Sequence, residues 1–202
     1  AILDPIPWLT YDHIFIDNAS TDNTVDILRT LAEKDKSVKV ILNTRNFGQI
    51  RSGNYALLEA TGDAVIHLVA DLQDPPELIP RLLEKWQEGY PIVIGQKCKT
   101  KDGWTMAILR GLFYRVIGVI SEVPQIESYT GFGLYDKKVI DTIRSLKDPY
   151  PYFRGLISEL GFDIATIKYE QPARQHGITT HNFYSLYDIA IPSPVEVFGF
   201  EV

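Results

Sequence analysis

The chain is poor in cysteine, in long apolar runs and in excess positive charge. Cys98 is its single cysteine, so no disulfide can form within the chain, and a cytosolic compartment is the simpler expectation. No stretch reaches the roughly 18 apolar residues of a membrane-spanning helix, and no charged start followed by an apolar block indicates a signal peptide. The net charge of −6 gives no reason to expect nucleic acid as a partner. As given, the chain is expected to be soluble.

What is present is typical of an ordinary globular protein. The 202 residues, 45% of them hydrophobic, are enough for one sizeable core, either as a single large α/β domain or as two closely joined lobes. Apolar runs of strand length alternate with segments of helical period up to residue 95. This alternation predicts right-handed crossovers and a doubly wound, mostly parallel sheet with helices on both faces. The expected strands span 13–16, 38–42, 65–70 and 92–95, and the helices follow the first three of them.

The stretch 65–77 ends an apolar run abruptly in carboxylates and prolines. A run without polar alternation predicts a strand buried on both faces, with Asp71 at its carboxyl end, where open α/β sheets bind ligands. Asp71 could hold a hard cation there, or it could be a turn residue. Asp74 is expected to cap a helix over 77–87, with Pro76 in the first turn. Ser20 or Thr21 is expected to cap the helix after the first strand.

The second half is built differently. A glycine-rich, aromatic strand is predicted over 130–135, then a helix over 137–146, a helix-like segment over 149–160 and a strand over 164–169. The helical period of 104–123 fits either a helix on the core or an amphipathic helix at a membrane interface. We expect a donor-binding half over 1–98, an acceptor-binding half over 99–190 and an unassigned tail over 191–202.

Three motifs together resemble the family 2 glycosyltransferases of GT-A fold. They span 15–24 (FIDNASTDNT), 44–48 (TRNFG) and 70–77 (ADLQDPPE). The chain looks most like the polyprenyl-phosphate group, which includes dolichol-phosphate mannose synthase and bacterial enzymes that load sugars on undecaprenyl phosphate. Segments 131–136, 154–157 and 174–188 extend the similarity. The joint spacing is specific, whereas each motif alone is weak.

The resemblance implies a nucleotide-diphosphate sugar as donor and Mg²⁺ or Mn²⁺ as cofactor. In the family an Asp-x-Asp motif binds the metal; here Asp71 and Gln73 match its ligands, but Val69 replaces the first acid. Asp17 matches the acid that contacts base and ribose. The remaining expected donor contacts are Asn18, Ser20, Asp22, Arg45, Gly48, Arg51 and Ala70. Arg45 and Arg51 could equally be ordinary solvated arginines at the surface that do not contact the donor.

The resemblance also implies an acceptor side that binds a lipid phosphate. A phosphate oxygen is already anionic, so it needs positive charge and hydrogen-bond donors more than a general base. Arg174, Gly177 and Thr179 match the family's phosphate loop, with Thr180 in place of its lysine and His181 beside it. Arg154 is a further candidate for phosphate contact, and Gly131 and Gly133 replace polar residues that are frequent around the motif phenylalanine. We therefore expect Asp71, Arg154 and Arg174 to carry the reaction.

The family opens with a strand that walls the nucleotide pocket, and many members continue into membrane helices. Neither is found in the sequence given, and we expect both to belong to the full protein. This chain would then be the peripheral domain of a membrane-anchored protein at the cytoplasmic face, able to form oligomers through those helices. The leading hypothesis is an inverting hexosyltransferase from a UDP- or GDP-sugar to a polyprenyl phosphate. Two alternatives stay open: a saccharide or protein hydroxyl as acceptor, and a relative that binds sugar nucleotides without turnover, which Val69 and Thr180 favour.

Overall fold

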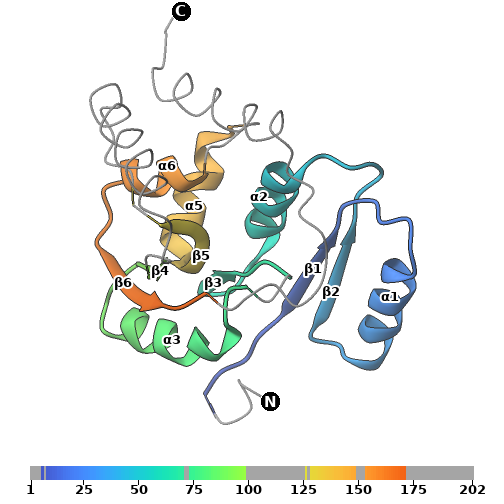
Figure 1. Ribbon diagram of the computed structural model, residues 1–202, viewed down its shortest axis with the longest axis horizontal. Coiled ribbons are helices and arrows are strands. Elements are labelled where there is room, and N and C mark those ends of the chain that lie inside the picture. The colour runs from blue at the N-terminus through green and yellow to red at the C-terminus, as the bar shows by residue number, and fades with distance from the viewer. Residues whose placement is uncertain are drawn as a thin grey trace, which may run out of the picture.

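Strands and helices alternate in the computed structural model, which describes residues 6, 8–70, 73–98, 126, 128–148 and 153–171. The first half contains β1 (His13–Asp17), α1 (Thr24–Lys34), β2 (Val38–Leu42), α2 (Gln49–Glu59), β3 (Ala64–His67), the 3₁₀ helix η1 (Pro76–Leu78), α3 (Ile79–Gln87) and β4 (Ile92–Lys97). The second half contains β5 (Tyr129–Asp136), α5 (Lys137–Leu146), α6 (Phe153–Glu159) and β6 (Ile164–Tyr169). Figure 1 shows their arrangement. No helix of the described part is long and apolar enough to cross a membrane.

The described strands form two hydrogen-bonded groups. β1 and β2 pair in parallel, and a four-stranded sheet has the order β3-β5-β4-β6. β4 and β6 are parallel, while β5 runs antiparallel to both β3 and β4. The expectation of an α/β fold is confirmed, and within the described sheet β5 is the strand that runs against the others, a direction that the sequence did not predict. The direction of β5 relative to its neighbours depends on pairing between residues far apart in the sequence, such as Val65 with Tyr135 and Ile92 with Tyr135.

The four-stranded sheet is covered on both faces, as predicted. Side chains alternate between faces along a strand, so Ile92 and Ile94 pack with α5 and α6 while Val93 packs with α3. All three are at most 1% exposed. Figure 1 shows α3 on one side of this sheet and α5 and α6 on the other. A further helix, α2, contacts both β1 and β3.

Glycines in β5 allow its close approach to β4. A Cβ at Gly133 would lie 2.6 Å from the carbonyl oxygen of Val93, so no side chain fits there at the present strand spacing. Gly131 has φ +99°, in the region that favours glycine, and the register between β4 and β5 shifts beside it. The packing of this sheet therefore excludes a side chain at Gly133, whereas at Gly131 it is the backbone conformation that favours glycine.

Two expected helix caps are wrong. Asp74 is 2% exposed and accepts a hydrogen bond from the hydroxyl of Tyr169 instead of capping a helix; the prolines after it begin η1, and α3 begins only at Ile79. The strand before Asp74 also ends early, at His67.

At the start of α1 the capping oxygen comes from neither Ser20 nor Thr21. The carboxylate of Asp22 accepts the N–H of Thr24 (3.0 Å), and the helix begins at that residue. By contrast, Asp136 does cap a helix: its side chain accepts the N–H of Lys138 (2.9 Å) at the start of α5. The other carboxylate oxygen of Asp136 accepts the indole N–H of Trp86 (2.7 Å).

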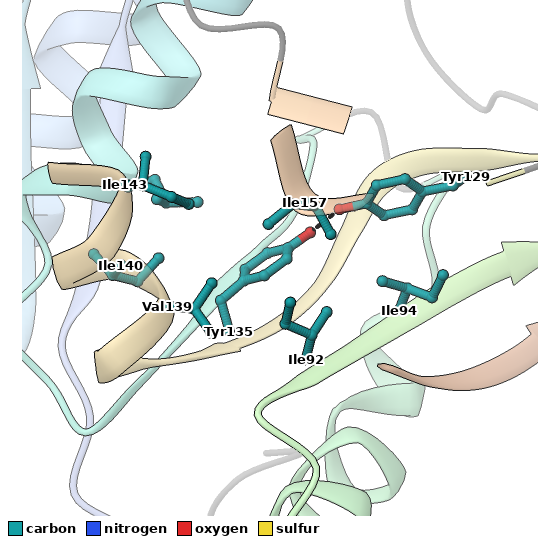
Figure 2. Packing of buried hydrophobic residues seen from close by; sticks show 9 residues of the cluster. Ile92, Ile94, Tyr129, Tyr135, Val139, Ile140, Ile143 and Ile157 are labelled. Atoms are coloured by element: carbon teal, nitrogen blue, oxygen red, sulfur yellow. Dashed lines mark hydrogen bonds between the residues drawn. The ribbon is translucent and has the colours of Figure 1, made fainter. Parts of the chain in front are cut away.

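A chain of polar groups crosses the apolar core between β5 and the helices. The hydroxyl of Tyr135 donates to the carbonyl oxygen of Gly131 (2.7 Å) and is itself hydrogen-bonded to Tyr129 (Figure 2). Burial raises the pKa of both phenols, which therefore stay neutral. Nδ1 of His67 lies 3.2 Å from the same carbonyl oxygen. The carbonyl oxygen of Gly131 thus accepts hydrogen bonds from both Tyr135 and His67, as is usual for a buried polar group.

The imidazole of His67 occupies space that helix α2 leaves open. A Cβ at Gly53 would lie 3.3 Å from its Nε2, which accounts for a glycine inside a helix, where it costs about 1 kcal/mol relative to alanine. The ring of Phe153 lies beyond, with its centroid 6.3 Å from that of His67. Burial lowers the pKa of His67, because the charged form is the one that loses hydration.

This lowered pKa makes stability depend on pH. In the unfolded chain the pKa of this imidazole is about 6.5, and in the folded chain it is lower. Below pH ~6.5 the unfolded chain therefore binds a proton at His67 more readily than the folded chain does, so the free energy of unfolding falls as the pH decreases through that range. His67→Asn keeps an N–H donor near the position of Nδ1 but cannot titrate. We expect its stability, measured by urea unfolding between pH 5 and 7.5, to change less with pH than that of the wild type. Equal pH dependence of the two proteins would contradict the buried, neutral imidazole.

Candidate functional site

The predicted donor residues gather where β1 and β2 end. Asp17 is the last residue of β1, pairs in register with Leu42, the last residue of β2, and is 5% exposed. Its Oδ2 accepts the N–H of Ser20 (3.0 Å), and its carbonyl oxygen accepts the N–H of Asn43 (3.0 Å). Within the described residues, the bond from Ser20 is the only hydrogen bond to this carboxylate. The other oxygen is therefore available to a donor from a ligand.

The neighbouring Asn18 holds two loops together. Its Oδ1 accepts from the hydroxyl of Ser52 (2.9 Å), the N–H of Phe47 (2.9 Å) and Nδ2 of Asn43 (3.2 Å). Its Nδ2 donates to Oδ1 of Asn46 (2.8 Å). These bonds engage both ends of the amide, so Asn18 fixes the loop before α2 against the end of β1. Local sequence reasoning placed Asn18 near the donor but could not find this role, because its partners lie 25 to 34 residues away.

The loop that Asn18 holds carries the two expected arginines. Gly48 has φ +86° at the start of α2, a conformation for which glycine is the usual residue, and its N–H donates to Oδ1 of Asn46 (2.9 Å). Arg45 is exposed, with its guanidinium 4.2 Å from the ring centroid of Phe47, a cation–π contact. Arg51 is exposed in the first turn of α2. Both arginines therefore stand at the surface beside the loop.

Other predicted donor residues are more peripheral. Ser20 and Asp22 are exposed. The pKa of Asp22 is lowered because Thr24 donates hydrogen bonds to its carboxylate, so this side chain has a structural task at the start of α1. Ala70 is exposed in the loop after β3, and Gln73 is half-buried.

A second group of residues lies at the carboxyl edge of the larger sheet, which is formed by the last residues of its parallel strands, His67, Lys97 and Tyr169. Arg154 is exposed on α6, next to the Phe153 ring that faces His67. The sequence analysis did not single out His67, because a lone histidine in an apolar run is usually a core residue without a further role. Gly53, inside the expected helix, was the signal that could have pointed to it.

Several predicted residues lie outside the described part of the chain. These residues are Asp71, Arg174, Gly177, Thr179, Thr180 and His181. The tail 191–202 and the segment 104–123, for which two kinds of helix were expected, also lie outside the described part. Among the described residues, no group of three or more His, Cys, Asp or Glu could hold a metal. The carboxylate of Asp71 and the amide oxygen of Gln73 are oxygen donors of the kind that Mg²⁺ and Mn²⁺ bind, so the donor set fits a hard cation.

A surface cavity among the described residues lies elsewhere. It is lined by Gly62 and Val65 near the start of β3, and by Lys137 and Arg144 of α5. None of the predicted site residues lines it. The guanidinium of Arg144 is engaged there, donating to the carbonyl oxygens of Leu58 (2.7 Å) and Ala60 (3.3 Å) at the end of α2.

Curated glycosyltransferases resemble this chain over most of its length. An uncharacterised glycosyltransferase of Synechocystis is 32% identical over 94% of this chain and 60% of that protein. A bactoprenol glucosyl transferase of Shigella phage SfX is 35% identical over 88% of this chain and 59% of that protein. The chain thus spans about 60% of the length of these relatives.

A solved structure has a similar fold. It is the mannosyltransferase PcManGT of Pyrobaculum calidifontis in complex with GDP-Man and Mn²⁺, 18% identical, with a TM-score of 0.50 over 81% of this chain and 49% of that one. This likeness supports a shared α/β fold of GT-A type. The sequence model of glycosyl transferase family 2 matches residues 1–144. The chain therefore belongs to glycosyl transferase family 2.

Proposed function

We propose that this chain is the catalytic domain of an inverting hexosyltransferase that moves a sugar from a UDP- or GDP-sugar to a polyprenyl phosphate. The observation that carries the proposal is the buried Asp17 at the end of β1, with one oxygen held by Ser20 and the adjoining loops fixed by Asn18. Such a preformed polar edge is where open α/β sheets bind nucleotides. Family membership and the relatives named bactoprenol glucosyl transferase support the acceptor class.

On the donor side, Asp17 accepts a hydrogen bond from a ribose hydroxyl or a base N–H through its available oxygen. Arg45 and Arg51 stand on the fixed loop and the first turn of α2, where their guanidinium groups can pair with diphosphate oxygens. A bound Mg²⁺ or Mn²⁺, held by Asp71 and Gln73, would stabilise negative charge on the leaving diphosphate. Because Val69 replaces the first acid of the motif, the diphosphate oxygens would have to supply further negative charge to the cation.

On the acceptor side, a lipid phosphate oxygen attacks the anomeric carbon from the face opposite the leaving group. The bond to the nucleotide diphosphate breaks, and that diphosphate leaves with the electron pair, so configuration inverts. The attacking oxygen is already anionic and needs no general base. Arg174, the loop that follows it and Arg154 provide positive charge and donors that bring the two phosphates together. A lipid acceptor places the reaction at a membrane surface, which we propose to be the cytoplasmic face.

The structure bears on one alternative, a hydroxyl acceptor. That acceptor would require a general base, and among the described residues of β5 the one carboxylate is that of Asp136. Both of its oxygens are engaged, by the N–H of Lys138 and the indole of Trp86, and it pairs with Ala64 at the beginning of β3, away from the carboxyl edge. Asp136 is therefore unsuited to the task. This favours an acceptor that carries its own negative charge.

Asp17→Asn tests the donor site. The substitution keeps the shape of the side chain but removes the charge, and a hydrogen bond to a charged group contributes about 1.5–3 kcal/mol. We expect at least tenfold weaker binding of UDP-glucose or GDP-mannose, measured by calorimetric titration of the full-length protein with Mn²⁺. Asp12→Asn is the matched control, because Asp12 lies just before β1 and pairs with the exposed Lys39 (2.6 Å). Equal donor affinity in the two variants would remove Asp17 from the site.

Arg174→Ala tests the acceptor site. Donor binding should survive, while the rate of transfer to undecaprenyl phosphate should drop at least tenfold, because a charge-assisted contact to the attacking phosphate is lost. Arg29→Ala, an exposed arginine of α1, serves as control and should behave as the wild type. If donor binding and transfer fall together, Arg174 belongs to the donor side instead.

A further inference from the structure

A buried hydrogen bond ties the loop after β3 to the end of β6. The hydroxyl of Tyr169 donates to Oδ1 of Asp74, across 95 residues of sequence. Tyr169 is 5% exposed and Asp74 is 2% exposed. A buried polar side chain loses its contacts with water and has to find hydrogen-bond partners inside the protein, so the position of Asp74 depends on partners of this kind.

The ring of Tyr169 is locked in place. Phe132 packs edge-on against it, with ring centroids 5.7 Å apart. Gly95 of β4 leaves the space that the two rings fill, since a Cβ there would lie 2.4 Å from Phe132 and 3.1 Å from Tyr169. The Tyr169 hydroxyl therefore has a fixed position at the carboxyl edge of the larger sheet. Its hydrogen bond holds the Asp74 carboxylate relative to that edge.

The chain around Asp74 is rigid on one side. Pro75 and Pro76 follow it, and proline fixes the backbone φ angle; the carbonyl of Pro75 accepts the N–H of Leu78 (3.1 Å) as η1 begins. On the other side Gln73 comes directly before it. Anchoring Asp74 thus fixes the backbone from which the Gln73 side chain extends.

We propose that Asp74 and Tyr169 are a positioning pair for divalent-cation binding, holding Gln73 where its amide oxygen can ligate the metal. The inference rests on the proposed function, which assigns Gln73 to the cation. With Val69 in place of an acid, this site has few anionic ligands, so exact placement of the neutral amide ligand matters more. Residues that orient metal ligands without touching the metal commonly change metal affinity by about 10–100-fold when removed.

Tyr169→Phe tests the pair, because it removes the hydroxyl and keeps the ring. Mn²⁺ is titrated calorimetrically into the full-length protein in the presence of UDP or GDP, and nucleotide binding is measured separately with chelator. We expect about tenfold weaker Mn²⁺ binding and unchanged metal-free nucleotide affinity. Asp74→Asn should act in the same direction, and the double variant should lose little more than either single variant, because both remove one interaction.

Trp86→Phe is the matched control. It also removes a side-chain hydrogen bond, the one to Asp136 (2.7 Å), at the opposite edge of the sheet. A general loss of stability would weaken Mn²⁺ binding similarly in both variants, whereas positioning affects Tyr169→Phe alone. Metal-dependent binding in the wild type with equal Mn²⁺ affinity in Tyr169→Phe would overturn this inference and leave the proposed function standing. Nucleotide binding by the wild type that is indifferent to Mn²⁺ would instead overturn the metal assignment itself.

Discussion

Two-sided burial of the strands β4 and β5 is the constraint on which the rest of the larger sheet depends. Ile92, Val93 and Leu134 are fully buried, so both faces must be covered, and α3 on one side and α5 with α6 on the other provide that cover. Gly133 lets β5 approach β4 closely enough to complete the layer. Once the parallel strands are fixed in this way, their carboxyl ends share one edge, and the polar residues at those ends are positioned together.

The ends of the parallel strands β1 and β2 also lie together, and here hydrogen-bonded loops surround them. The amide of Asn18 satisfies donors and acceptors of the loop before α2, so these loops are ordered before any ligand binds. Preorganised loops lose less conformational entropy on binding. The buried carboxylate of Asp17 then offers an oxygen in a fixed direction, which is what selective recognition of a nucleotide requires.

Local sequence patterns predicted those elements that local chemistry determines. The helix over 137–146 and the strands over 38–42 and 164–169 have the predicted bounds, because their apolar period is unbroken and their ends are marked by polar residues. The direction of β5 could not be predicted, since strand pairing depends on long-range packing. Asp74 was misread as a cap for the same reason: an aspartate before prolines suits a helix start, and its true partner, Tyr169, is distant in sequence. The placement of Asp17 at a strand end followed from the pattern, whereas the bonds of Asn18 and His67 did not.

In the proposed reaction, negative charge on the acceptor phosphate takes the place of a general base. The most direct measurement compares transfer of the sugar by the full-length protein, with its preferred nucleotide sugar and Mn²⁺, to undecaprenyl phosphate and to unphosphorylated undecaprenol in the same detergent. We expect glycosylation of the phosphate lipid alone, with release of the nucleotide diphosphate in equal amount. Comparable transfer to the free alcohol, or to a saccharide hydroxyl in place of the lipid phosphate, would contradict it.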